Sequence, residues 1–267
     1  MLSYLPERQK LLGDANLPRN LKLTLAYDGH DFAGWQVQPD RPTVQGTLLS
    51  AIEHLTGEKT LPQGSGRTDA GVHALAQVAS VALASPIPAA NLRTALNDIL
   101  PPSIRVLEVE EVTADFHARR SARAKTYRYR IYRNQVCPPF LSRYVHHHPY
   151  PLIEERMVAA AGLVVGEHDF TSFAAVDPES GKEGMEIDNV RNIYASAWTR
   201  EGEELVYTVR GNGFLHHMVR NLVGTFLLIG KGSLDAADLA RILAQRDRSA
   251  AGPTAPASGL FLVSVEY

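Results

Sequence analysis

Strand-like and helix-like segments alternate along this chain, and that alternation limits the folds it can adopt. Residues 21–27 place apolar side chains at every second position, the pattern of a strand with one buried face. Residues 44–55 carry apolar side chains at helical spacing, with Thr43 suited to cap the start and Gly57 to end the helix. The same alternation returns between residues 152 and 265. The sequence therefore predicts an α+β fold built from two related halves.

The expected organisation has three parts: an N-terminal extension over residues 1–20 and two α+β halves over residues 21–120 and 121–267. A chain of 267 residues is long enough for two domains or for one large domain. We expect mixed or antiparallel sheets in the halves, flanking a central basic cleft. Asn91 and Ser233 are candidate caps of two further helices.

Charged residues are segregated along the chain, although the formal net charge is only -2. Between residues 116 and 153 there is no Asp or Glu, while eight cations lie in that span. Such segregation is typical of a surface that binds a polyanion, and the alternative is a solvated basic surface without a partner. The cations are Arg119, Arg120, Arg123, Lys125, Arg128, Arg130, Arg133 and Arg143.

Several classes of protein are excluded or disfavoured. Cys137 is the only cysteine, so neither an intrachain disulfide nor a cysteine-rich zinc site can form. No run of about 18 apolar residues occurs, and the first residues lack the apolar segment of a signal peptide. We therefore expect a cytoplasmic protein that does not associate with a membrane.

A glycine-rich stretch supplies the strongest candidate for chemistry. Gly64, Gly66 and Gly71 surround Arg67 and Asp69, and glycine allows a backbone to bend sharply or to lie close to a ligand. An ionised Asp can act as a covalent nucleophile, and a nearby guanidinium favours that ionised form. The alternative is an Asp that only satisfies the amides of a turn.

Two other elements offer side chains for a site. Arg220 lies among apolar positions of a predicted helix, so it needs a partner such as Asp69 unless it reaches solvent. Residues 125–132 alternate as a strand, with Tyr127 on the apolar face and Arg128 and Arg130 on the other. Tyr127 could stack on a planar base, or it could be an ordinary core residue.

Neither metals nor nucleotide cofactors are expected. His216 and His217 would lie in the helix predicted from about residue 215, where neighbouring residues do not converge. Histidines 146–148 would alternate across a strand, so neither cluster has the spacing of metal ligands. The sequence contains no phosphate-binding loop and no dinucleotide fingerprint, which favours an enzyme without a cofactor.

Five groups of residues, in a fixed order, resemble the tRNA pseudouridine synthase A family and cover about residues 21 to 267. The chain departs from the family pattern in its N-terminal extension and in a longer, more acidic loop over residues 177–188. The matching segments read FAGWQ with TVQ (32–36, 43–45), GRTDAGVH (66–73), FHAR with KTYRY (116–119, 125–129), GNGFLHHMVRN (211–221) and AGPTAP (251–256).

The resemblance implies the pseudouridine synthase fold and the isomerisation of uridine to pseudouridine in the anticodon stem-loop of tRNA, at positions 38, 39 and 40. It implies that Asp69 is the nucleophile, attacking C1′ of the ribose or C6 of the base, and that Tyr127 stacks on the extruded uracil. Arg220 or Arg67 would pair with Asp69. A homodimer is also implied, with no metal, nucleotide or redox cofactor.

The resemblance further indicates which residues contact tRNA. A base inside a stem must leave the stack before its glycosidic bond can be reached, at a cost of about a few kcal/mol. Contacts between basic residues and the RNA backbone can offset that cost. The implied contact residues are Arg67, Phe116, His117, Ala118, Arg119, Arg120, Tyr127, Arg128 and Arg130.

Two other functions fit parts of the sequence. A non-catalytic tRNA- or RNA-binding protein would have no need of Asp69 on a glycine-rich loop. A glycoside hydrolase usually needs two carboxylates flanking the bond, and Asp69 is the only acid between residues 64 and 97. The carboxylate is thus the feature that separates an isomerase from both alternatives.

Overall fold

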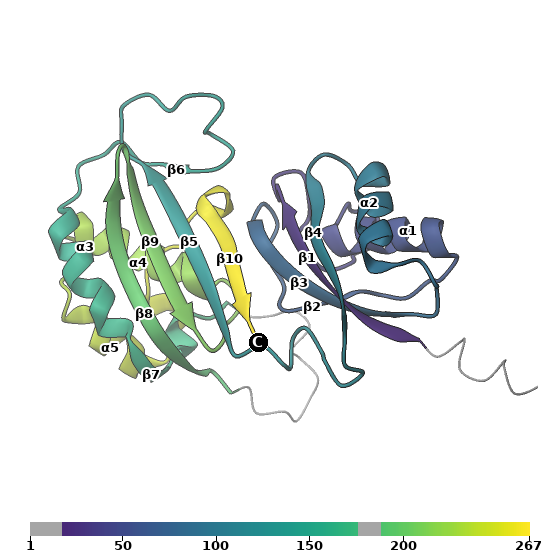
Figure 1. Cartoon of the computed structure of the whole chain (residues 1–267). Coiled ribbons are helices and arrows are strands. Elements are labelled where there is room, and N and C mark those ends of the chain that lie inside the picture. The colour runs from purple at the N-terminus through teal and green to yellow at the C-terminus, as the bar shows by residue number, and fades with distance from the viewer. Residues whose placement is uncertain (1–17, 176–187) are drawn as a thin grey trace, which may run out of the picture.

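The computed structural model describes residues 18–175 and 188–267. Most of the predicted N-terminal extension and of the predicted acidic loop lies outside these described residues. Within them, the strands form one 10-stranded mixed sheet, in the order β4-β1-β3-β10-β5-β9-β8-β7, with β2 beside β3 and β6 beside β5. Helices pack on the sheet in both parts of the molecule (Figure 1), so the α+β prediction is confirmed.

The N-terminal part of the sheet is antiparallel. Strand β1 lies between β3 and β4; Leu21, Leu23, Leu25 and Tyr27 are buried and the residues between them are half-buried, as the period-two pattern predicts. Two helices pack against this part of the sheet, and the short strand β2 leads into the catalytic candidate loop. The bounds are β1 Arg19–Tyr27, α1 Val44–Thr56, β2 Gln63–Gly64, β3 His73–Leu83, α2 Ala89–Ile99 and β4 Ile104–Val112.

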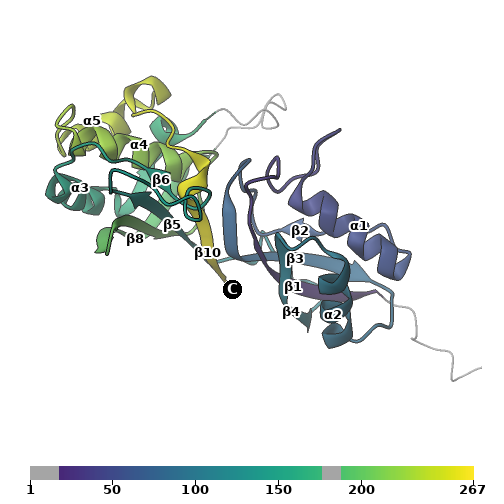
Figure 2. The same ribbon diagram turned by 90° about the horizontal axis from the view of Figure 1, so that it is seen from above.

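In the C-terminal part, β5, β9, β8 and β7 form a second antiparallel array, and the short β6 pairs with β5 in parallel. Three helices lie on one face of this array (Figure 2). Tyr127, Tyr129 and Ile131 of β5 are buried on one face, which confirms the predicted alternation of that strand. The bounds are β5 Ala124–Tyr132, β6 His146–His147, α3 Glu154–Ala161, β7 Gly166–Asp169, β8 Val190–Glu201, β9 Glu204–Gly211, α4 Met218–Gly230 and α5 Asp238–Gln245. No helix among the described residues is long and apolar enough to cross a membrane.

The last strand, β10 (Leu260–Glu266), joins the two arrays. It pairs antiparallel with β5 and, over Phe261 and Leu262 only, parallel with His73 and Ala74 of β3. The two parts of the chain therefore share one continuous sheet, and the strand nearest the C-terminus lies in its middle (Figure 1).

Helix α1 begins and ends where the sequence predicts, but two other helices do not. The Thr43 hydroxyl accepts a hydrogen bond from the amide of Gly46 at 3.2 Å, and Gly57 ends α1 in the left-handed conformation. Helix α2 instead begins at Ala89, directly after Pro88, so Asn91 lies inside it and caps nothing. Ser233 donates its amide to Leu228 at the end of α4, and α5 starts only at Asp238.

Candidate active site

The loop that carries Asp69 lies between β2 and β3 and is fixed by the neighbouring segment 32–36. The amide of Trp35 donates to the carbonyl of Thr68 at 3.0 Å, and the Thr68 hydroxyl lies 2.9 Å from the Tyr27 hydroxyl. Gly34 has a φ of +99°, and a Cβ there would lie 2.6 Å from the Thr68 carbonyl oxygen. The backbone at Gly34 and Trp35 therefore lies directly against the backbone of Thr68, and this contact sets the position of Asp69.

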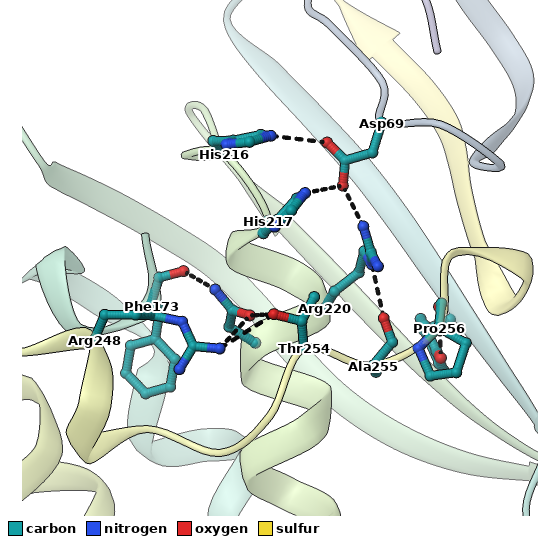
Figure 3. A network of polar contacts seen from close by, with 11 residues as sticks. Asp69, Phe173, His216, His217, Arg220, Arg248, Thr254, Ala255 and Pro256 are labelled. Carbon is teal, nitrogen blue, oxygen red and sulfur yellow. Dashed lines mark hydrogen bonds and ion pairs between the residues drawn. The ribbon is translucent and has the colours of Figure 1, made fainter. Parts of the chain in front are cut away.

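Arg220, in the first turn of α4, forms an ion pair with the carboxylate of Asp69 (Figure 3). Its Nη1 lies 2.8 Å from Asp69 Oδ2, and its Nε donates to the carbonyl oxygen of Ala255 at 2.7 Å. Both side chains of the ion pair are mostly buried, at 14% and 17% exposure. The guanidinium is thus fixed from two sides, and burial from water strengthens its attraction to the carboxylate.

Segment 251–256 lies along α4 and is itself fixed by a buried amide. Asn221, which is fully buried, accepts hydrogen bonds at Oδ1 from Thr254 Oγ1 at 2.7 Å and from Arg248 Nη2 at 2.9 Å. Its Nδ2 donates to the carbonyl oxygen of Phe173 at 2.7 Å. These contacts lie below and to the left of the ion pair in Figure 3, and they fix the segment whose carbonyl at Ala255 binds Arg220.

Two histidines also face Asp69, contrary to the expectation that neighbours at 216 and 217 would diverge. His216 Nε2 lies 3.6 Å from Asp69 Oδ1, and His217 Nε2 lies 3.4 Å from Oδ2. The helix begins at Met218 and not near residue 215, and His217 has a φ of 59°, so both rings turn to one side. Burial lowers the pKa of His217 despite the nearby carboxylate, which favours its neutral form.

Asp69, His216 and His217 offer ligand atoms within 4.8 Å of one another, a spacing that could accommodate a metal ion. The guanidinium of Arg220 already contacts one of these ligand atoms, Asp69 Oδ2. Its positive charge repels a second cation there, so the geometry favours the ion pair over a metal complex.

Tyr127 lies in the same surroundings as Asp69. Its side chain is 8% exposed, and its ring packs edge-on against Phe214 with the ring centroids 5.0 Å apart. Burial raises the pKa of the Tyr127 phenol above its usual value, and nearby Tyr27 and Asp69 raise it further. The phenol therefore keeps its proton at neutral pH.

The other predicted contact residues fall into two groups. Arg67 is exposed on the Asp69 loop, and Arg119 and Arg120 are exposed on the loop before β5. His117 Nδ1 accepts from the amides of Arg119 and Arg120, at 3.1 and 3.4 Å, so this histidine shapes the backbone that carries them. Phe116 packs against Tyr267, with the ring centroids 4.8 Å apart, and the amide of Ala118 donates to Ser80 Oγ at 3.1 Å, so both residues anchor the same loop.

The remaining predicted contacts lie in the sheet. Arg130 forms a two-pronged pair with Glu204, at 2.7 and 2.6 Å, and so its charge is largely balanced within the chain. Arg128 Nε is buried without a hydrogen-bond partner among the described residues. Arg133 and Arg143 of the basic stretch also pair with carboxylates, those of Glu154 and Asp31. Three of the basic stretch's cations are therefore balanced by acids elsewhere in the chain.

A comparison with protein families places this fold and site in a known class. Residues 24–119 and 160–267 match the family described as "tRNA pseudouridine synthase". The two matched segments include Asp69, the loop at 116–119, Arg220 and segment 251–256. The chain is accordingly an enzyme of the pseudouridine synthase class, which consists of isomerases, and has the fold of that class.

Comparison with single proteins narrows the family further. The "tRNA pseudouridine synthase A" of Solibacter usitatus is 53% identical over 249 residues, covering 93% of this chain and 100% of the relative. That of Brevibacillus brevis is 49% identical over the same share of each chain, and that of Moorella thermoacetica is 46% identical over 92% and 99%. The chain belongs to the tRNA pseudouridine synthase A family.

Proposed function

We propose that this enzyme isomerises uridine to pseudouridine at positions 38, 39 and 40 in the anticodon stem-loop of tRNA, with Asp69 as the nucleophile. The observation that carries the proposal is the ion pair between Asp69 Oδ2 and Arg220 Nη1 at 2.8 Å. The pair presents an ionised carboxylate in a fixed orientation, as covalent attack requires. Among the described residues, the groups that form ion pairs with this carboxylate are Arg220, His216 and His217, and none of them is a second acid of the kind a glycoside hydrolase uses.

The reaction conserves all atoms of the uridine. Asp69 forms a transient bond to C1′ of the ribose or to C6 of the base, and the N1–C1′ bond breaks. The uracil then turns over, C5 bonds to C1′, the C5 proton leaves and N1 acquires a proton. The bond to Asp69 breaks in the same sequence, so the carboxylate returns to its pairing with Arg220.

Tyr127 supplies an aromatic surface for the extruded base in this scheme. Its raised pKa keeps the phenol protonated near neutral pH, so the hydroxyl acts as a hydrogen-bond donor and not as a phenolate base. The exposed Arg67, Arg119 and Arg120 contact the RNA backbone and offset the cost of extruding the base, about a few kcal/mol. The protein acts as a homodimer on tRNA in this proposal.

The test is release of tritium from tRNA labelled at C5 of uridine, with Asp69→Asn as the main variant. Asn has the same shape but cannot attack, so we expect release by the native enzyme, release at least about a thousandfold slower by the variant, and tRNA binding by both. Asp98→Asn, an exposed change on α2, is the matched control and should keep full activity. Equal release by the native enzyme and Asp69→Asn would remove Asp69 from the chemistry.

A further inference from the structure

Lys125, the second residue of β5, is a half-buried cation that forms no ion pair with a carboxylate of the described residues. Its Nζ donates to the carbonyl oxygen of Ser65 at 2.6 Å. None of the ion pairs formed by residues 18–175 and 188–267 includes this ammonium group. Removing a cation from water without a counter-charge destabilises a protein, so such a residue calls for another explanation.

The backbone of the catalytic loop leaves room for this lysine. A Cβ on Gly66 would lie 2.9 Å from Lys125 Nζ, closer than such contacts normally come. Gly66 is three residues before Asp69 and follows Ser65, the acceptor of the lysine. The ammonium group thus touches the loop that carries Asp69.

Two arginines from other segments lie near Lys125, and their like charges disfavour its charged form. Burial, together with the positive charges of Arg119 and Arg191, lowers the pKa of Lys125 to about 8. Arg191 stands at the start of β8, where its Nη1 donates to the carbonyl oxygens of Asp188 and Val190. Three cations from the loop before β5, from β5 and from β8 therefore lie together.

The sheet explains why these cations meet at one place. Strands β5 and β8 lie on either side of β9, and both start at the same end of the sheet (Figure 1). Near that end, Gly211 of β9 lies opposite both Lys125 of β5 and Ile193 of β8. A Cβ on Gly211 would lie 2.9 Å from Ile193 Cδ1, so the side chain of Ile193 packs over this glycine. Arg119 is exposed, so the group of cations opens to solvent on that side.

We propose that Lys125, Arg119 and Arg191 form a binding site for a backbone phosphate of the RNA strand that carries the target uridine. This inference rests on the proposed function, since that function supplies the RNA. A phosphodiester carries a permanent negative charge and oxygen acceptors, and it would provide the counter-charge that the described part of the chain does not. Because Lys125 contacts the loop of Asp69, the bound phosphate would position the substrate relative to the nucleophile.

The site should be sensitive to pH. The charged groups facing Lys125 are Arg119 and Arg191, with Asp188 beside Arg191 and the Arg210–Glu266 pair on the adjoining strands β9 and β10. A bound phosphate raises the pKa of Lys125, so binding near pH 8 takes up a proton. The affinity for tRNA should therefore fall as the pH rises from about 8 to about 9, in addition to any general effect.

The decisive experiment measures tRNA binding against salt concentration for the native enzyme and for Lys125→Met, with Lys59→Met as the control at an exposed lysine after α1. We expect Lys125→Met to bind about tenfold more weakly and to lower the slope of log K against log salt by about one. We expect its melting temperature to stay the same or rise, because an unpaired half-buried cation is removed. A slope and affinity equal to those of the native enzyme, in a folded variant, would overturn the proposal.

A measurement on the unaltered protein guards against a variant that fails to fold. Binding enthalpies of tRNA at pH 8, in buffers with different heats of ionisation, give the protons taken up on binding. We expect a net uptake that disappears at pH 6, where Lys125 is already charged; no uptake at pH 8 would overturn the proposal. If inorganic phosphate alone, at equal concentration of phosphate groups, produces the same uptake, the site is one for free phosphate and the proposal is wrong.

These binding measurements are independent of the isomerisation. An enzyme that binds tRNA as described but releases no tritium would disprove the proposed function and leave the phosphate site standing. Full tritium release by the native enzyme, together with an unchanged salt slope for Lys125→Met, would disprove the phosphate site and leave the proposed function standing.

Discussion

Arg220 uses two different nitrogens for two different partners, Asp69 Oδ2 and the carbonyl oxygen of Ala255. A lysine at this position would keep the charge but could not reach both acceptors with the same geometry. We expect Arg220→Lys to lower kcat/KM for tRNA by about ten- to a hundredfold, the loss expected for one hydrogen bond to a charged group. Tritium release under single-turnover conditions measures this.

Arg93→Lys, an exposed change on α2, provides the matched control for that experiment and should leave the rate unchanged. Native activity in Arg220→Lys would show that charge alone is needed at this position. In that case the bond to Ala255 would have no part in orienting the carboxylate.

Chelation separates the ion pair from a metal complex at Asp69. A metal bound between Asp69 and His217 would use Asp69 Oδ2, and Arg220 already contacts that oxygen. We therefore expect treatment with EDTA to leave the rate of tritium release unchanged within error. The measurement compares untreated enzyme, EDTA-treated enzyme and EDTA-treated enzyme with zinc added back. Loss of activity that zinc restores would assign Asp69, His216 and His217 to a metal site.

Single residues of the site differ in how far the sequence predicts them. A lone Arg among apolar helix positions implies a carboxylate partner, and Arg220 does bond to Asp69. The approach of His216 and His217 to the same carboxylate depends on the positive φ of His217, a backbone conformation that non-glycine residues seldom adopt. No spacing of residue types marks that conformation, so the sequence alone could not place these rings.

At the scale of elements, helix α4 and segment 251–256 pack with almost no space between them. A Cβ on Gly224 would lie 1.7 Å from the carbonyl oxygen of Pro253, which is backbone and cannot move alone. We expect Gly224→Ala to displace the segment, to lower stability by roughly 1–3 kcal/mol and to reduce activity, because Ala255 moves away from Arg220. Thermal unfolding and tritium release measure the two effects.

Gly162→Ala is the control for that prediction, since a Cβ at Gly162 meets no atom within 4 Å and its backbone is helical. It should be neutral or slightly stabilising, by up to about 1 kcal/mol. If Gly224→Ala kept native stability and activity, the contact between α4 and segment 251–256 would not position Arg220.

The elements themselves were predictable where the signals are local. A cap at Thr43, helical periodicity and a terminal glycine define α1 within the sequence, and alternation defines β1 and β5. The starts of α2 and α5 depend on other contacts: Pro88 precedes the first, and Ser233 bonds to the end of α4. The pairing of β10 with β3 joins residues almost 190 positions apart in the sequence. The pattern of neighbouring residues contains no information about such a pairing.

The whole molecule should lose stability in mild acid because of a half-buried histidine, His146, and a buried one, His148. Burial lowers the pKa of both His146 and His148 to about 4, from an ordinary value of 6.5. The unfolded chain therefore binds more protons than the folded chain between about pH 6.5 and about pH 4, and the free energy of unfolding falls as the pH falls through that window. Melting temperatures across this range measure the effect.

We expect His146→Gln to make the melting temperature less dependent on pH between about 6.5 and about 4, whereas His54→Gln, at an exposed histidine, should not. His146 Nδ1 and His148 Nε2 have no hydrogen-bond partner among the described residues, which fits neutral rings in the folded protein. An identical pH dependence in His146→Gln and the native protein would mean that His146 is not responsible.

The central position of β10 has a consequence during synthesis on the ribosome. Until β10 is translated, the parts of β3 and β5 that pair with it have unpaired backbone groups, the kind of edge that joins other chains. Ala255 is also made only shortly before β10, so Arg220 lacks one of its acceptors in every shorter nascent chain. The order of translation thus delays both closure of the sheet and assembly of the site until β10 is made, and chains that stall just before β10 are those most exposed to aggregation.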